Sequence, residues 1–326
     1  MLDLLGKILK EIREIERDYE NAEIEWTGHR FAHIEIIKRQ FLYYDFNSLN
    51  MCLLHRKGKI AEIIHEVEAV IEEVFEYIRA NDYNSFVLLI GRGEVFPGLK
   101  NTEGSDCVMD YQMDRYHDET RERFYLNYLN RNYRRDGFDY SGKSGIDDLS
   151  IEMMIYTHLW ESYYFLKSLK RIASIVNGDN YLWEVVIPDG GKCSFVKGII
   201  TALQEKNLKL GDIIEKGYNS DIRNSFAHAL YNVDVFVKTI TLRPRRGERT
   251  IPFSEFQQKF LYSVILMNKL QNMMENLHDE VGKCNALVTK PFLTPDGLEV
   301  QVYACMEERG GKLYPEIRLV KPPRSR

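Results

Sequence analysis

The feature that most constrains this chain is the recurrence of apolar residues at three- and four-residue steps, which is the period of amphipathic helices. The most apolar stretch, 150–176, carries apolar side chains on most of its circumference. This predicts one long helix that is buried centrally or against a second subunit. Further helices are expected over 1–19, 30–44, 59–78, 111–133, 193–206, 209–216, 220–231 and 254–277.

Two segments change to a period of two, which is typical of strands. Residues 233–251, with a turn at Pro244–Gly247, predict a β-hairpin whose tip carries several arginines. Residues 298–306 and 313–320 flank a Gly310-Gly311 turn and predict a β-like tail. The expected fold is mainly α, a helical bundle with a β-hairpin insertion and a small C-terminal β element.

A small, polar, glycine-rich stretch over 136–148 is the best candidate for a domain boundary. We therefore expect a helical N-terminal region over 1–140, to which the sequence assigns no role, and a linker over 141–149. A helical domain over 150–282 and a small β tail over 283–326 would follow.

Composition excludes several classes of protein. Lysine and arginine number 44 against 49 aspartates and glutamates, so a uniformly basic nucleic-acid binder is excluded, although a local basic patch is not. No run of 18 apolar residues occurs, and the N-terminal stretch lacks the unbroken apolar segment of a signal peptide. Five scattered cysteines without a CxxC pair fit reduced thiols in the cytoplasm and argue against a zinc ribbon.

The stretch 220–231 carries the most informative chemistry. Gly217 ends the preceding helix, and either Asn219 or Ser220 can cap the next one. Arg223 then falls in the first turn, and Asn224 and His228 lie four residues apart on one face. A fixed cation, an amide, unpaired backbone N–H groups and a titratable imidazole together suit a phosphate ligand.

These groups are also what RNA cleavage without a metal requires. The 2′-hydroxyl must lose a proton before it attacks the phosphorus, and the leaving 5′-oxygen must gain one. Histidine transfers protons near neutral pH, and arginine stabilises the charge of the phosphorane.

The string Arg223-Asn224-x-x-x-His228, preceded by Asp221-Ile222 at a helix start, resembles the signature of HEPN-domain proteins, which have an R-x(4–6)-H motif. The resemblance covers about 150–280. It implies a helical bundle that dimerises and brings two motifs into one cleft, as in metal-independent endoribonucleases of toxin–antitoxin, abortive-infection and other antiviral systems. It also implies Arg223, Asn224 and His228 as catalytic residues, RNA as substrate, and no cofactor or metal.

Several alternatives and secondary candidates stay open. A non-catalytic RNA- or nucleotide-binding module on the same fold is one, and a homodimer, an antitoxin or a phage-derived trigger are the expected partners. Asp221 is expected as a helix-start charge, with an orienting role as the alternative. His158 and Glu161 are expected as a buried polar pair, with a place in a dimer cleft as the alternative.

Two further patterns bear on phosphate binding. Four arginines at the expected hairpin tip either contact RNA backbone or belong to a solvated turn: Arg243, Arg245, Arg246 and Arg249. Residues 137–144 match the phosphate-loop pattern GxxxxGK[ST], but no buried strand precedes them, so a linker is favoured over a nucleotide hydrolase. The pairs Glu62/His65 and Glu275/His278 are weak indications of a metal site, and the acidic side of 59–76 is expected to be solvated.

Overall fold

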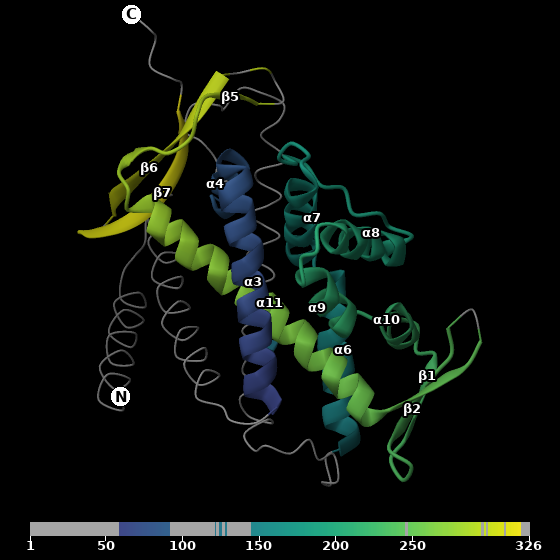
Figure 1. The fold of residues 1–326 in the computed structure, drawn as a ribbon. Coiled ribbons are helices and arrows are strands. Elements are labelled where there is room, and N and C mark those ends of the chain that lie inside the picture. Colours follow the sequence, from purple (N-terminus) through teal and green to yellow (C-terminus); the bar gives the residue numbers. More distant parts are fainter. Residues whose placement is uncertain are drawn as a thin grey trace, which may run out of the picture. The chain divides into compact units, whose positions relative to one another are not determined.

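Figure 1 shows a computed structural model of the chain. It describes residues 59–91, the positions 121, 124, 125 and 128, and residues 145–320 except 245, 246, 295, 296, 298 and 310. The fold is mostly helical, with small antiparallel sheets and a C-terminal β element, which confirms the coarse prediction. The helices are α3 (Lys59–Asn81), α4 (Tyr83–Ile90), α6 (Gly145–Glu161), α7 (Tyr163–Asn177), α8 (Lys192–Glu205), α9 (Leu210–Gly217), α10 (Ser220–Ala227) and α11 (Phe253–Gly282).

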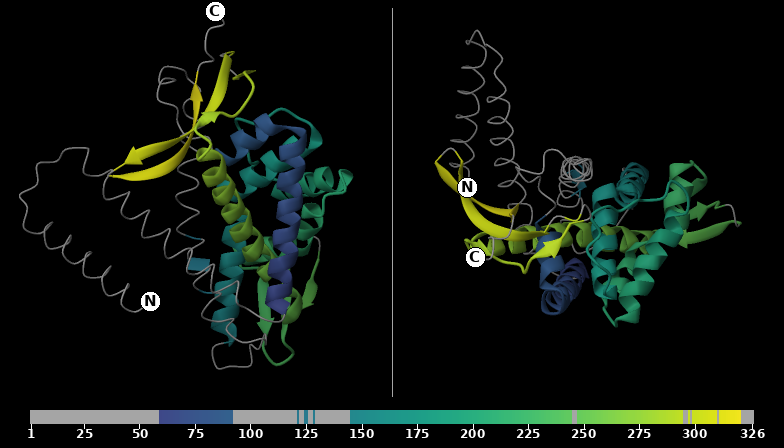
Figure 2. Two further views of the ribbon diagram at one scale, coloured as in Figure 1. Left: turned by 60° about the vertical axis from the view of Figure 1, so that its left-hand side comes forward. Right: turned by 90° about the horizontal axis from the view of Figure 1, so that it is seen from above.

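Helix α11 is the element on which many of the others pack. It contacts α3, α4, α6 and α9 along its length and both sheets at its ends (Figures 1 and 2). Several of its apolar side chains, among them Phe256, Phe260 and Leu266, are completely buried. The helix starts one residue before the expected position 254, and its N-cap, Pro252, makes no side-chain hydrogen bond.

Helix α3 confirms its predicted position and its apolar side, which is buried against α11. Its acidic side is only partly solvated. Glu66 pairs with Lys216 of α9 and accepts a hydrogen bond from Tyr262 of α11, and Glu68 lies 2.7 Å from the buried ammonium of Lys269. The glutamates therefore connect α3 to its neighbours, whereas His65 points to solvent as expected.

The single long helix predicted over 150–176 is wrong, because the chain breaks at Ser162 into α6 and α7. Ser162 has an extended backbone, and its hydroxyl accepts a hydrogen bond from Phe165 N at 3.1 Å, which caps α7. The two helices bury different faces. When the stretch is treated as one continuous helix, these two faces together cover most of its circumference. Gly178 ends α7 in the left-handed conformation.

A three-stranded antiparallel sheet follows α10, with β1 (Tyr231–Asp234), β2 (Thr239–Leu242) and β3 (Arg249–Pro252) in that order. The C-terminal sheet contains β4 (Ala286–Leu287), β5 (Phe292–Leu293), β6 (Glu299–Arg309) and β7 (Lys312–Val320). Strands β6 and β7 pair from Gln301↔Val320 to Arg309↔Lys312, so their hairpin turn is the predicted one. Buried His278 of α11 has Nδ1 3.1 Å from the Ile90 carbonyl and Nε2 3.4 Å from that of Pro315, so it connects α4 with β7.

The predicted domain boundaries differ from the observed organisation. Helix α6 begins at Gly145, inside the expected linker 141–149. Helix α3 belongs to the expected N-terminal region, yet it packs on α11, and the two compact units of the chain divide between Asn50 and Met51. The glycine-rich stretch did not indicate the boundary, because a compact unit is defined by contacts between residues that are distant in the sequence.

Several sequence predictions lie outside the described residues. They are the helices over 1–19 and 30–44, the phosphate-loop pattern at 137–144, and Arg245 and Arg246. The described positions between 121 and 128 are helical, in agreement with the helix expected over 111–133.

Candidate functional site

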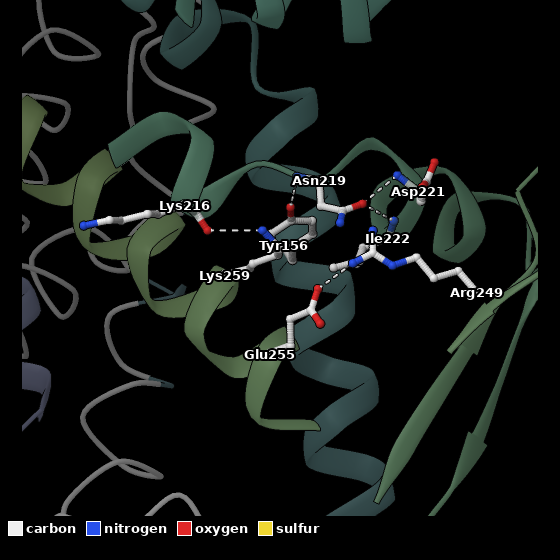
Figure 3. A network of polar contacts seen from close by, with 8 residues as sticks. All are labelled: Tyr156, Lys216, Asn219, Asp221, Ile222, Arg249, Glu255 and Lys259. Carbon is white, nitrogen blue, oxygen red and sulfur yellow. Dashed lines mark hydrogen bonds and ion pairs between the residues drawn. The ribbon is translucent and has the colours of Figure 1, made fainter. Parts of the chain in front are cut away.

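The start of the motif helix α10 is positioned by a buried tyrosine from α6. Asn219 is the N-cap, and its Oδ1 accepts hydrogen bonds from Asp221 N at 2.9 Å and Ile222 N at 3.2 Å (Figure 3). The fully buried Tyr156 hydroxyl donates to the Gly217 carbonyl at 2.9 Å and accepts from Asn219 N at 2.7 Å. One hydroxyl therefore satisfies both sides of the α9–α10 turn, and burial raises the pKa of Tyr156 well above its usual range.

Helix α10 is shorter than predicted and ends at His228, which is its C-cap rather than an interior residue. The His228 N–H still donates to the Asn224 carbonyl at 3.1 Å, so the two residues are one turn apart. Ala229 N donates to Phe226 O and Leu230 N to Ser225 O, which is the Schellman pattern. Strand β1 begins at Tyr231. Its backbone N–H and C=O groups pair with β2 and are therefore not available to extend helix α10.

Ala229 occupies the left-handed position of this C-terminus, with φ of 54°, where glycine is usual. We expect Ala229→Gly to stabilise the fold by about 0.5–1 kcal/mol, because relief of the Cβ clash exceeds the added entropy of the unfolded chain. Urea unfolding measures this difference. Asn207→Gly is the control at φ of 58°, and it should gain less because asparagine tolerates this conformation. Equal or opposite effects would contradict the assignment of strain to Ala229.

Arg223 is held on two sides in a partly buried position. Its Nη1 donates to Asn224 Oδ1 at 2.7 Å, and its Nε lies 3.0 Å from Glu161 Oε1. The second contact is an ion pair rather than an aligned hydrogen bond, because Nε has no hydrogen-bond partner. Glu161 is the last residue of α6. The end of this helix before Ser162 therefore determines the position of the carboxylate that contacts Arg223.

Glu161 also pairs with a second cation, Lys192, the first residue of α8. Lys192 Nζ lies 5.8 Å from the centre of the Tyr163 ring, which Lys167 approaches to 5.6 Å from α7. Tyr218, between α9 and α10, packs edge-on against Trp160, with ring centres 4.9 Å apart. Its buried hydroxyl has no hydrogen-bond partner, and burial raises the pKa of Tyr218 to about 12.

The structure therefore brings Arg223, Asn224 and Glu161 into direct contact and places His228 one turn away, with its side chain exposed. Asp221 lies in the first turn, half-buried, with its N–H bound to the cap. The expected buried pair of His158 and Glu161 is wrong, because His158 is exposed. Incomplete solvation of its ring and the positive charge of Arg121 lower the pKa of His158, and the charge of Glu161 opposes them.

Arg243 and Arg249 flank the turn at Pro244–Gly247 between β2 and β3, as expected, because Gly247 N donates to the Pro244 carbonyl at 3.1 Å and Leu242 pairs with Arg249. The prediction missed one strand, because an earlier tip separates β1 from β2. Asp234 Oδ1 accepts from Phe236 N and Val237 N, so the chain turns before the arginines, and Phe236 at that tip is 95% exposed. Arg243 N donates to the Leu230 carbonyl at 2.9 Å, so this connection starts beside the end of α10.

Both described arginines of this group are in ion pairs. Arg243 lies 3.2 Å from Glu248, and Arg249 lies 2.9 Å from Glu255 at the start of α11 (Figure 3). Exposed pairs of this kind contribute about 0–1 kcal/mol, so they compete only weakly with a phosphate for the guanidinium groups.

The apolar residues of 150–176 were expected to be buried either centrally or against a second subunit, and the structure buries them within one subunit. In α6 and α7 the large apolar residues Met153, Leu159, Trp160, Leu166 and Leu169 are at most 1% exposed. The homodimer stays a prediction, and these two helices no longer supply an argument for it.

Sequence reasoning missed Lys192, Tyr156 and Tyr218 as parts of the site. Lys192 lies 31 residues from Glu161 along the chain, and Tyr156 lies 63 from Asn219. No spacing rule connects residues at such distances. The one local signal is the Gly190-Gly191 pair, which places Lys192 at the start of a helix.

In the described part of the chain, no three His, Cys, Asp or Glu side chains gather to hold a metal ion, and no helix is long and apolar enough to cross a membrane. Comparison of the chain with known protein families, with curated proteins and with solved structures found no match.

Proposed function

We propose that this chain is a metal-independent endoribonuclease with a HEPN-like helical domain, in which Arg223, Asn224 and His228 act on RNA. One observation carries the proposal. The Arg223 guanidinium is fixed in a partly buried position by Asn224 and Glu161, while the His228 side chain lies exposed one turn further along the same element. A fixed cation and an accessible imidazole five residues further on are the groups that phosphate-ester chemistry uses.

The proposed reaction balances without an added oxidant or metal. An imidazole accepts the proton of the 2′-hydroxyl, the O2′–P bond forms, the P–O5′ bond breaks, and a protonated group gives its proton to the 5′-oxygen. Arg223 offsets the additional negative charge of the phosphorane. A guanidinium has five N–H donors, so the contacts to Asn224 and Glu161 leave donors for the phosphate.

The reaction uses a base and an acid, whereas one motif has one imidazole. A homodimer with the two copies of His228 facing one groove supplies both and doubles the Arg223 charge. In this proposal the protein is a toxin or antiviral-defence effector that is controlled by an antitoxin or a phage-derived trigger.

The test is incubation of the purified chain with single-stranded RNA in EDTA, followed by analysis of the product ends. We expect cleavage to continue in EDTA and to leave 2′,3′-cyclic phosphate and 5′-hydroxyl ends. Products with 5′-phosphate ends, or activity that EDTA abolishes, would contradict this mechanism.

The second candidate is a non-catalytic RNA- or nucleotide-binding module on the same fold. The ion pair with Glu161 favours it, because an arginine engaged by a carboxylate has fewer donors for a phosphorane. Wild-type protein that binds RNA without cutting it would select this candidate.

A further inference from the structure

Glu161 joins two cations that come from different parts of the fold. One carboxylate oxygen faces Arg223 Nε of α10 and the other binds Lys192 Nζ of α8. Both cationic groups therefore lie within the span of a single carboxylate. The two non-bridging oxygens of a phosphodiester have a similar span and the same single charge.

The two cations that share the Glu161 carboxylate are largely buried. The side chains of Lys192 and Arg223 are only 12% and 14% exposed, while Glu161 is 34% exposed. The half-buried Asp221 is a further carboxylate near the adjoining Tyr218. Partly desolvated cations attract an anion more strongly than solvated ones, because the local dielectric constant is lower.

The surroundings of the pair favour a nucleic-acid phosphate over a free anion. The Tyr163 ring is 44% exposed, and its centre lies 5.8 Å from Lys192 Nζ and 5.6 Å from Lys167 Nζ. Exposed aromatic rings stack on unpaired bases. The buried Tyr218 hydroxyl, which has no hydrogen-bond partner, interacts electrostatically with Arg223 and Glu161 and stays protonated, so it is a donor at the same place.

From these contacts we infer that Lys192 is a second phosphate-binding residue, which shares one RNA phosphate with Arg223, and that Glu161 holds the two cations together. This inference rests on the proposed function in its choice of RNA as ligand. It assigns to α8 a role that the motif helix alone does not indicate.

The experiment measures binding of a fluorescein-labelled, single-stranded 2′-O-methyl oligoribonucleotide by anisotropy, since this probe cannot be cut by 2′-hydroxyl attack. We expect Lys192→Gln to weaken binding about 10-fold, the scale of one hydrogen bond to a charged group, and Lys192→Arg to retain it. Lys197→Gln removes the same charge from an exposed position of α8 and should change affinity less than about twofold. Equal effects of Lys192→Gln and Lys197→Gln would overturn the inference.

A double-mutant cycle tests whether the two cations share one phosphate. In an Arg223→Gln background, Lys192→Gln should then weaken binding less than about twofold further, because coupled residues are not additive. Full additivity would show two separate phosphates and would overturn the shared site.

Pyrophosphate separates failure of this inference from failure of the proposed function. If the oligonucleotide does not bind, thermal unfolding with pyrophosphate should still show stabilisation of wild type and of Lys192→Arg but not of Lys192→Gln. That result would keep the cation pair and reject RNA as its ligand. Absence of stabilisation in wild type would reject the pair as an anion site.

Discussion

Replacing His228 or Arg223 with alanine is expected to lower the rate of RNA cleavage about 100-fold or more. Loss of a proton-transfer group or of a charge that stabilises the phosphorane has effects of this size. The His228 side chain is exposed at the end of α10, so its removal should not disturb packing. The measurement is the single-turnover cleavage rate of labelled RNA with excess protein.

The control is His65→Ala, which removes another exposed histidine from α3, away from the motif helix. This variant should cleave at the wild-type rate. If His228→Ala also cleaves at the wild-type rate, the imidazole does not transfer the proton, and the proposed chemistry is wrong. Arg223→Lys should recover only part of the lost rate, because an ammonium cannot reproduce the planar contacts of a guanidinium to Asn224 and Glu161.

Tyr156→Phe is expected to destabilise the protein by about 2–3 kcal/mol and to lower cleavage as well. The hydroxyl is completely buried and contacts the Gly217 carbonyl and the Asn219 N–H. Its removal leaves the Asn219 N–H without its acceptor and leaves the Gly217 carbonyl with only the 3.3 Å contact from Ser263 Oγ. Asn219 caps α10, and a displaced cap would move Arg223 relative to Glu161. Urea unfolding and the cleavage rate at a temperature where the variant is folded measure the two effects.

Tyr303→Phe is the matched control, because its hydroxyl donates to Asn285 at the surface of the C-terminal sheet. It should change the free energy of unfolding by less than about 0.5 kcal/mol. Equal stability of Tyr156→Phe and wild type would mean that other groups satisfy the α9–α10 turn.

Local patterns in the sequence predicted many of the elements. The apolar side of α3, Gly217 at the end of α9 and the turn between β6 and β7 lie where they were expected. Where the predicted secondary structure was wrong, a side-chain hydrogen bond to the local backbone ended or turned the element. Ser162 caps a new helix inside an apolar stretch, and Asp234 stabilises an additional turn before the predicted one at Pro244–Gly247.

The sequence by itself determined the helical class, the N-terminus of the motif helix and the closeness of Arg223 to Asn224, because each of these depends on residues within a few positions of one another. The tertiary structure alone decided that Glu161 and Lys192 meet Arg223 and that Tyr156 holds Asn219. It also decided that α6 and α7 bury their apolar residues within one subunit. The physical reason is that these contacts join residues tens of positions apart, and only the packing of α6, α8 and α10 brings them within hydrogen-bond distance.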